Sequence, residues 1–148
     1  MNIIIRKACK NDIDSIVSLL IDDELGAIRE ELGHPNYLIA FNKINNDPQQ
    51  LLIVCELDSK IIGTAQLTII PYISRKGICR GLIEAVRVHS LYRGKGIGKQ
   101  MFKWLINESR QRGCKLVQLT TDKSRIEALN FYKSLGFIDT HIGMKLEL

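Results

Sequence analysis

Residues 86–99 read Val-Arg-Val-His-Ser-Leu-Tyr-Arg-Gly-Lys-Gly-Ile-Gly-Lys, which is typical of a strand, a glycine-rich turn and the first turn of a helix. Glycine lets a ligand approach the backbone closely, so that successive N–H groups can converge on one anion. The positive end of the helix dipole adds to this attraction, and a diphosphate group suits such a turn. We therefore expect a phosphate-bearing ligand at this point of the fold.

Three phosphate-binding patterns compete for this turn. A Walker loop needs Ser or Thr after Gly-Lys, and Gln100 stands there instead. A dinucleotide-binding GxGxxG needs a third glycine at a position held by Lys99 or Met101. The pattern Arg/Gln-x-x-Gly-x-Gly/Ala is matched in full, by Arg93, Gly96 and Gly98.

The length of the chain and the lack of a linker-like segment predict one domain over residues 1–148. Residues 51–57 and 61–70 are expected to pair as a hairpin. A second helical or irregular segment is expected before them, where the pattern weakens over residues 26–48. The other expected strands are 2–7, 78–90, 116–121 and the region 137–148, and the expected helices are 13–21, 96–112 and 124–134. The predicted fold class is α/β, with a mixed, mostly antiparallel sheet flanked by helices.

A second group of residues follows the turn in a definite order. A strand at 116–121 precedes a short helix that carries Asn130-Phe131-Tyr132, and Gly136-Phe137 comes next. Together with the turn, this order resembles the GNAT superfamily of N-acetyltransferases, and the resemblance covers most of residues 61–137. It implies a single-domain GNAT fold in which two parallel strands, ending near Ser90 and Thr121, splay apart.

The resemblance also implies the ligand. Acetyl-coenzyme A would be the co-substrate, with its pyrophosphate on the turn and its pantetheine arm between the splayed strands, and no metal would be needed. The cofactor-binding residues that the resemblance implies are Val86, Val88, Arg93, Gly94, Lys95, Gly96, Ile97, Gly98, Lys99, Asn130 and Tyr132.

Two residues are candidates for proton transfer. By resemblance Tyr132 lies near the cofactor sulfur, and a well-placed tyrosine hydroxyl can protonate a leaving thiolate; the alternative is a packing role beside Phe131. Glu84 is the candidate base that takes a proton from the attacking amine; the alternative is a solvated strand residue. Strict alternation puts Glu84 on one face with Val86 and Val88, and a bulge in this strand would change that arrangement.

Composition narrows the class of protein. The chain has 148 residues with 45% hydrophobic content and four scattered cysteines, so a core without disulfides is expected. No apolar run is long enough to span a membrane and no signal peptide is apparent, which predicts a cytoplasmic protein. The net charge of +5 is concentrated in residues 87–112, but no nucleic-acid-binding motif accompanies it, so neither nucleic acid nor membrane is an expected partner.

The acceptor has no motif of its own in this sequence. The segments 118–122 and 125–132 are similar to those of small-molecule members of the superfamily, which favours a small-molecule amine as acceptor, acetylated by direct attack in a ternary complex. A protein or peptide acceptor, or a non-catalytic acyl-coenzyme A sensor, remains an alternative. A homodimer is possible, as in many relatives.

Overall fold

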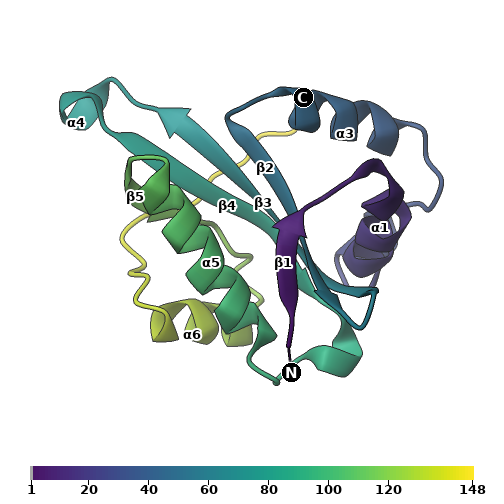
Figure 1. Ribbon diagram of the computed structural model, residues 1–148. Coiled ribbons are helices and arrows are strands. Elements are labelled where there is room, and N and C mark those ends of the chain that lie inside the picture. The colour runs from purple at the N-terminus through teal and green to yellow at the C-terminus, as the bar shows by residue number, and fades with distance from the viewer. Residues whose placement is uncertain (1) are drawn as a thin grey trace.

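The computed structural model describes residues 2–148 and is built around one twisted sheet in the order β1-β2-β3-β4-β5 (Figure 1). The strands are β1 (Ile4–Lys7), β2 (Gln50–Leu57), β3 (Lys60–Pro71), β4 (Cys79–Val88) and β5 (Cys114–Gln118). The helices are α1 (Ile13–Ile21), α2 (Gly26–Arg29), α3 (Asn36–Asn46), α4 (Ser74–Gly77), α5 (Ile97–Gln111) and α6 (Ile126–Ser134), with short 3-10 turns η1 (Lys10–Asp12) and η2 (Ser90–Tyr92).

The first four strands pair antiparallel, each with its neighbour in the chain. The expected hairpin between β2 and β3 is confirmed, and its turn residues Asp58 and Ser59 have φ values of 48° and 63°. Positive φ at both central residues matches the right-handed twist of the two strands, and Asp tolerates it better than most residues.

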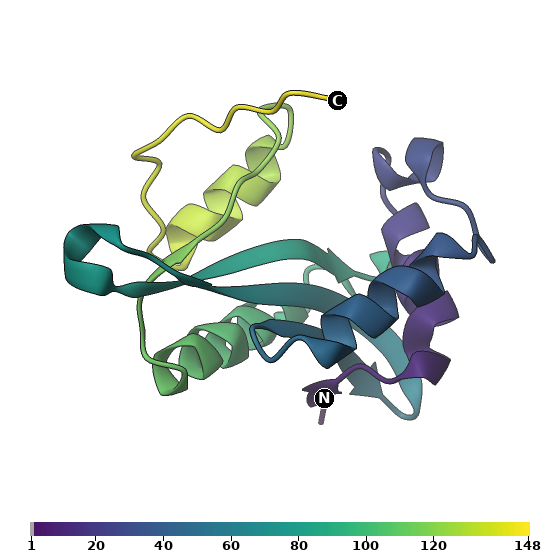
Figure 2. The ribbon, with the colours of Figure 1, turned by 90° about the horizontal axis from the view of Figure 1, so that it is seen from above.

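The two faces of the sheet carry separate hydrophobic clusters, because alternate strand residues point to opposite sides. On one face α5 packs with Met101, Phe102 and Leu105 against strand residues such as Ile53 and Leu67. On the other face α1 and α3 cover Val54, using Ile16 and Phe41. Figure 2 shows α5 on one side of the sheet and α6 with the C-terminal segment on the other.

The parallel pair β4 and β5 separates part of the way along, as the sequence predicted. Its last paired residues are Leu82 and Gln118, and β4 continues to Val88 without a partner on that edge. The sheet therefore offers a length of unpaired β4 backbone directly before the glycine-rich turn.

One expectation from the sequence was left open and one was wrong. The second segment after the first helix, expected as helical or irregular, contains the helix α3, whose buried Phe41 anchors it to the sheet. Residues 138–148, expected as a strand region, belong to no helix or strand, although their apolar side chains alternate. A strand needs a partner to bond its backbone groups, and Ile142, Met144 and Leu146 remain exposed here.

No helix within residues 2–148 is both long and apolar enough to cross a membrane.

Candidate active site

The glycine-rich turn leaves open space above its backbone. Gly94 and Gly96 have φ values of 73° and 78°, and a Cβ built on either would meet no atom within 4 Å. Gly96 is the N-cap of α5, and the fully buried side chain of Ile97 fixes the start of the helix. The first N–H groups of a helix have no acceptor within it, so this end can receive an anion.

Gly98 has a different reason to be glycine. A Cβ at this position would lie 3.3 Å from the Phe131 ring of α6, which is tighter than an ordinary contact. Gly98 therefore lets α6 pack against the first turn of α5. The sequence placed it among the ligand contacts for its lack of a side chain, and the structure uses that lack for helix packing.

The side chain of Arg93 points away from the space above the turn. Its Nε donates to the carbonyl of Val88 (3.0 Å) and its Nη2 to the carbonyl of Asp22 (2.5 Å). The guanidinium thus ties the end of β4 to the end of α1 and shapes the turn. All three predicted cations, Arg93, Lys95 and Lys99, are exposed, and the Lys95 ammonium lies 5.3 Å from the centre of the Tyr92 ring.

The open edge of β4 presents Val86 and Val88. The N–H of His89 bonds to Ile62 of β3 (2.9 Å), and backbone directions alternate along a strand, so the N–H and C=O of Val88 point to the open side. Val86 is two residues earlier and points the same way. The Val86 carbonyl accepts from Arg87 Nη1 (2.8 Å). Since the carbonyls of Val86 and Val88 already accept from Arg87 and Arg93, the N–H groups are what this edge offers to the amide carbonyls of a ligand.

A bulge changes the expected orientation of Glu84. Gln66 pairs with Glu84 but Thr64 pairs with Arg87, so β4 has one extra residue here, and Ala85 takes a φ of 50°. Val86 and Val88 accordingly pack toward the α5 side, while Glu84 is exposed on the opposite face. Glu84 does not share a face with the two valines, and its carboxylate is exposed on the face opposite α5.

Tyr132 belongs to an aromatic group at the junction of α5 and α6. Its ring makes edge contacts with Phe102 (5.5 Å between centroids) and Phe137 (6.2 Å). Burial raises the pKa of the Tyr132 hydroxyl, and the nearby charges of Arg125 and Arg87 act in the opposite direction. Asn130, on the same helix, is exposed.

Two consecutive acidic residues after α1, Asp22 and Asp23, contact residues near the turn, on β4 and at the start of α6. Neither was predicted from the sequence. Asp22 accepts from the N–H of Ser90 (2.6 Å), and Asp23 pairs with Arg87 (3.3 Å) and with Arg125. The chain can turn tightly here because Gly26 lies against α1, where a Cβ would be 1.8 Å from the Leu20 carbonyl oxygen. No local motif signals these contacts.

The residues present fit coenzyme A. The open turn with its free helix end suits a diphosphate, and the unpaired β4 edge suits an arm that contains amide groups. Within residues 2–148, no three His, Cys, Asp or Glu side chains are grouped so that they could hold a metal ion.

Known proteins resemble this chain over the same region. The model of the Acetyltransferase (GNAT) family matches residues 13–137. A glucosamine 6-phosphate N-acetyltransferase from Trypanosoma brucei brucei is 39% identical over 89 residues, which are 60% of this chain and 58% of that enzyme. An aminoalkylphosphonate N-acetyltransferase from Salmonella typhimurium is 26% identical over 93% of this chain and 86% of its own length. N-alpha-acetyltransferase 30 from Saccharomyces cerevisiae is 37% identical over 40% of this chain and 34% of its own length.

Solved structures share the whole fold. A Bacillus halodurans C-125 protein described as a transcriptional regulator has a TM-score of 0.96 and 43% identity, and the match covers 99% of this chain and 100% of that one. A predicted acetyltransferase from Clostridium acetobutylicum, solved with acetyl-CoA, has a TM-score of 0.76 and 26% identity over 99% of this chain and 96% of that one.

Proposed function

The chain belongs to the GNAT family of acetyltransferases, and we propose that it transfers the acetyl group of acetyl-coenzyme A to a primary amine of a small molecule. The observation that carries this proposal is the open turn at Gly94 and Gly96, placed at the end of the unpaired β4 edge. A diphosphate on the turn directs the rest of a coenzyme A molecule along that edge, toward Tyr132.

Acetyl-coenzyme A supplies an activated acetyl thioester when it is bound. The chain then has to hold the amine close to the thioester and to move its protons. An amine that arrives as an ammonium loses one proton before it attacks and a second as the amide forms, while the departing sulfur gains one, so one proton is released overall. Direct attack of the amine in a ternary complex requires no covalent intermediate with the protein.

Tyr132 is the proposed donor to the sulfur. A donor must be protonated at neutral pH, and burial raises the pKa of this hydroxyl above its usual value of about 10. A coenzyme thiol, with a pKa of about 8.5 on the model-thiol scale, can accept that proton. The aromatic packing of the ring limits its rotation, which favours a fixed position for the hydroxyl.

Glu84 is the proposed acceptor of the amine proton, directly or through water. The bulge at Ala85 turns its carboxylate to the face opposite α5, where its cross-strand neighbour is Gln66. An exposed carboxylate on this face lies in reach of an incoming amine, while the cofactor arm uses the strand edge. Acceptor and cofactor thus approach from different directions.

The relatives support a small acceptor. The names of two relatives contain glucosamine 6-phosphate and aminoalkylphosphonate. Both compounds are small molecules with one primary amine and a phosphorus oxyanion. The match to N-alpha-acetyltransferase 30 supports a protein N-terminus as the alternative acceptor. A sensor that binds acyl-coenzyme A without turnover is the third candidate, and the presence of both Glu84 and Tyr132 argues against it.

The test is calorimetric titration with acetyl-coenzyme A, with ATP and NAD as controls, followed by thiol release in the presence of small amines and of peptides. Micromolar binding of acetyl-coenzyme A alone, with thiol release driven by small amines, supports the proposal. Release driven only by peptides supports the alternative acceptor. Folded protein that does not bind acetyl-coenzyme A contradicts both the transferase and the sensor.

A further inference from the structure

Three charged side chains from distant parts of the chain meet beside the open edge of β4. Asp23 lies between α1 and α2, Arg87 is on β4, and Arg125 is the N-cap of α6. Arg87 Nη2 lies 3.3 Å from the Asp23 carboxylate, and Arg125 Nη2 bonds to both oxygens of the same carboxylate. We call these three residues the Asp23 cluster.

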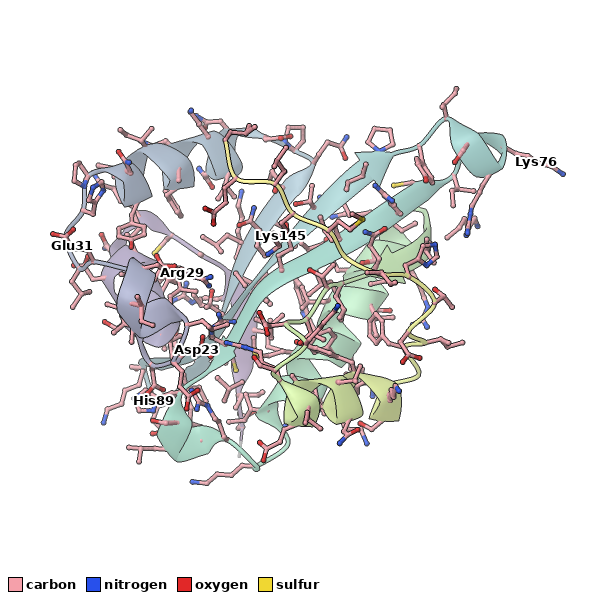
Figure 3. The ribbon with its side chains drawn as sticks, turned by 180° about the vertical axis from the view of Figure 1, so that it is seen from behind. Asp23, Arg29, Glu31, Lys76, His89 and Lys145 are labelled. Atoms are coloured by element: carbon pink, nitrogen blue, oxygen red, sulfur yellow. The ribbon has the colours of Figure 1, made fainter. Side chains whose placement is uncertain are left out.

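The Asp23 cluster is mostly buried and its charges do not balance. The side chains of Asp23, Arg87 and Arg125 are only 15%, 12% and 29% exposed. One carboxylate faces two guanidinium groups, and Arg29 on α2, which is itself paired with Glu30 at 3.3 Å, also acts on the pKa of Arg87. Figure 3 shows Asp23 and Arg29 on the face of the sheet opposite α5. Excess positive charge away from water attracts an anion.

One donor in the cluster has no acceptor. The Nε–H of Arg87 is buried and unpaired among residues 2–148, although both terminal nitrogens of the same guanidinium are bonded. Leaving a buried donor unpaired is unfavourable, and such donors commonly mark a place where a ligand or water binds. The alternative is a purely structural role, in which the ion pairs of Asp23 only hold α1 and α6 together. That role explains the contacts of Asp23, but it does not explain the second positive charge or the unpaired Nε–H of Arg87.

The cluster adjoins the reacting groups. Arg87 follows Val86 on the open edge, and the charges of Arg87 and Arg125 act on the Tyr132 hydroxyl. Glu84 is three residues before Arg87 on the same strand. The Asp23 cluster therefore shares the strand of Glu84 and is close enough to Tyr132 for its charges to act on the hydroxyl.

We propose that Arg87 and Arg125, held by Asp23, bind an anionic oxygen group on the acceptor, so that the preferred substrate is a small primary amine carrying a phosphate-like or carboxylate group. This inference rests on the proposed function and names the substrate class for it. Asp23 fixes the planes of the two guanidinium groups, and the acceptor anion supplies the negative charge that the cluster lacks.

The test compares matched amines. Phosphoethanolamine, β-alanine and ethanolamine are titrated calorimetrically into the protein, with and without saturating coenzyme A, and their acetylation is followed in parallel. We expect at least one anionic amine to bind about 10- to 100-fold more tightly than ethanolamine, the gain typical of charge-assisted hydrogen bonds in a mostly buried site. Tighter binding of phosphoethanolamine would indicate recognition of a phosphate-like group, and tighter binding of β-alanine would indicate recognition of a carboxylate.

Variants assign the preference to the cluster. Arg125→Met is expected to remove most of the preference for anionic amines and to leave the affinity for coenzyme A unchanged. Arg29→Met, at a more exposed site, is expected to reduce that preference by a smaller factor. Lys133→Met is the matched control, because it removes one positive charge from the same helix α6, where Lys133 pairs with Asp139 at 3.0 Å. Melting temperatures show that each variant is folded.

The inference would be overturned by equal binding of all three amines to the wild-type protein, by an unchanged preference in folded Arg125→Met, or by an equal loss of preference in Lys133→Met. A loss of coenzyme A affinity in Arg125→Met would also overturn it, since the cluster would then serve the cofactor. Failure of the wild-type protein to bind coenzyme A contradicts the proposed function instead, and the titrations without coenzyme A still measure the preference.

Discussion

Replacing Gly96 with tryptophan should abolish the binding of acetyl-coenzyme A. Gly96 has a φ of 78°, and no atom lies within 4 Å of the position that a Cβ would take. The new side chain therefore extends into the space where we place the diphosphate. Its bulk prevents the N–H groups of the turn and of the first turn of α5 from reaching an anion.

The expected loss can be estimated. Blocking the turn removes about two charge-assisted hydrogen bonds of about 1.5–3 kcal/mol each, so the affinity should fall by about two to four orders of magnitude. A side chain in the left-handed region also costs about 1–2 kcal/mol of stability. For a domain of this size that cost lowers Tm by about 2–8 °C.

Gly113→Trp is the matched control for this strain. Gly113 follows the other end of α5, has a φ of 81° and also has no atom within 4 Å of its Cβ position. The Gly113→Trp variant should show a similar decrease in Tm, and a calorimetric titration should give the wild-type affinity for acetyl-coenzyme A. A Gly96→Trp protein with a Kd within threefold of the wild type, or a Gly113→Trp protein that loses binding equally, would refute the assignment of the turn.

The remaining predictions concern the two proton-transfer groups and one buried carboxylate. Tyr132→Phe should lower kcat about a hundredfold or more with little change in the Kd of acetyl-coenzyme A; in the wild type, its deprotonation should reduce kcat only above about pH 10, because burial raises the pKa of Tyr132. A fall of kcat from pH 8 upward would contradict this role. Glu84→Gln should lower kcat/KM at pH 7 by about 10²–10⁴, with a smaller deficit at alkaline pH where more of the amine is already neutral; a pH-independent deficit would mean that Glu84 takes no proton. Asp12→Asn should lower the free energy of unfolding at pH 7 by about 1.5–3 kcal/mol, because Asp12 is buried and accepts from Arg6 at 2.7 and 3.0 Å. Since Arg6 lowers the pKa of Asp12, that stability is present above the unfolded pKa and is lost as the pH falls below about 4, so the wild type and the variant should converge in acid melts; an equal difference in Tm at pH 7 and pH 2 would contradict it.

The resemblance over most of residues 61–137 was sufficient for the family and for the order of the elements within that stretch. The glycines of the turn, the strand before it and the helix after it are neighbours in the chain, so their geometry follows from local preferences that a sequence displays directly. The parting of β4 from β5 was also expected, and the structure has it beyond Leu82 and Gln118.

Single extra residues were harder to predict. Alternation assigned Glu84 to the face of Val86 and Val88, and the bulge at Ala85 reverses this, because one unpaired residue inverts every side chain beyond it. The same limit applies to residues 138–148, whose alternating pattern predicted a strand. Alternation shows that a segment suits a sheet, whereas a strand also requires an adjacent partner to bond with.

The sequence by itself determined the glycine-rich turn, because its groups come from consecutive residues between Arg93 and Lys99. Only the tertiary structure decided where the charged side chains around it point. It turns Arg93 to Asp22 across 71 positions of sequence, and it brings Arg125 to Asp23 across 102. Contacts of this kind depend on how whole elements pack together, so no local pattern of residues reports them.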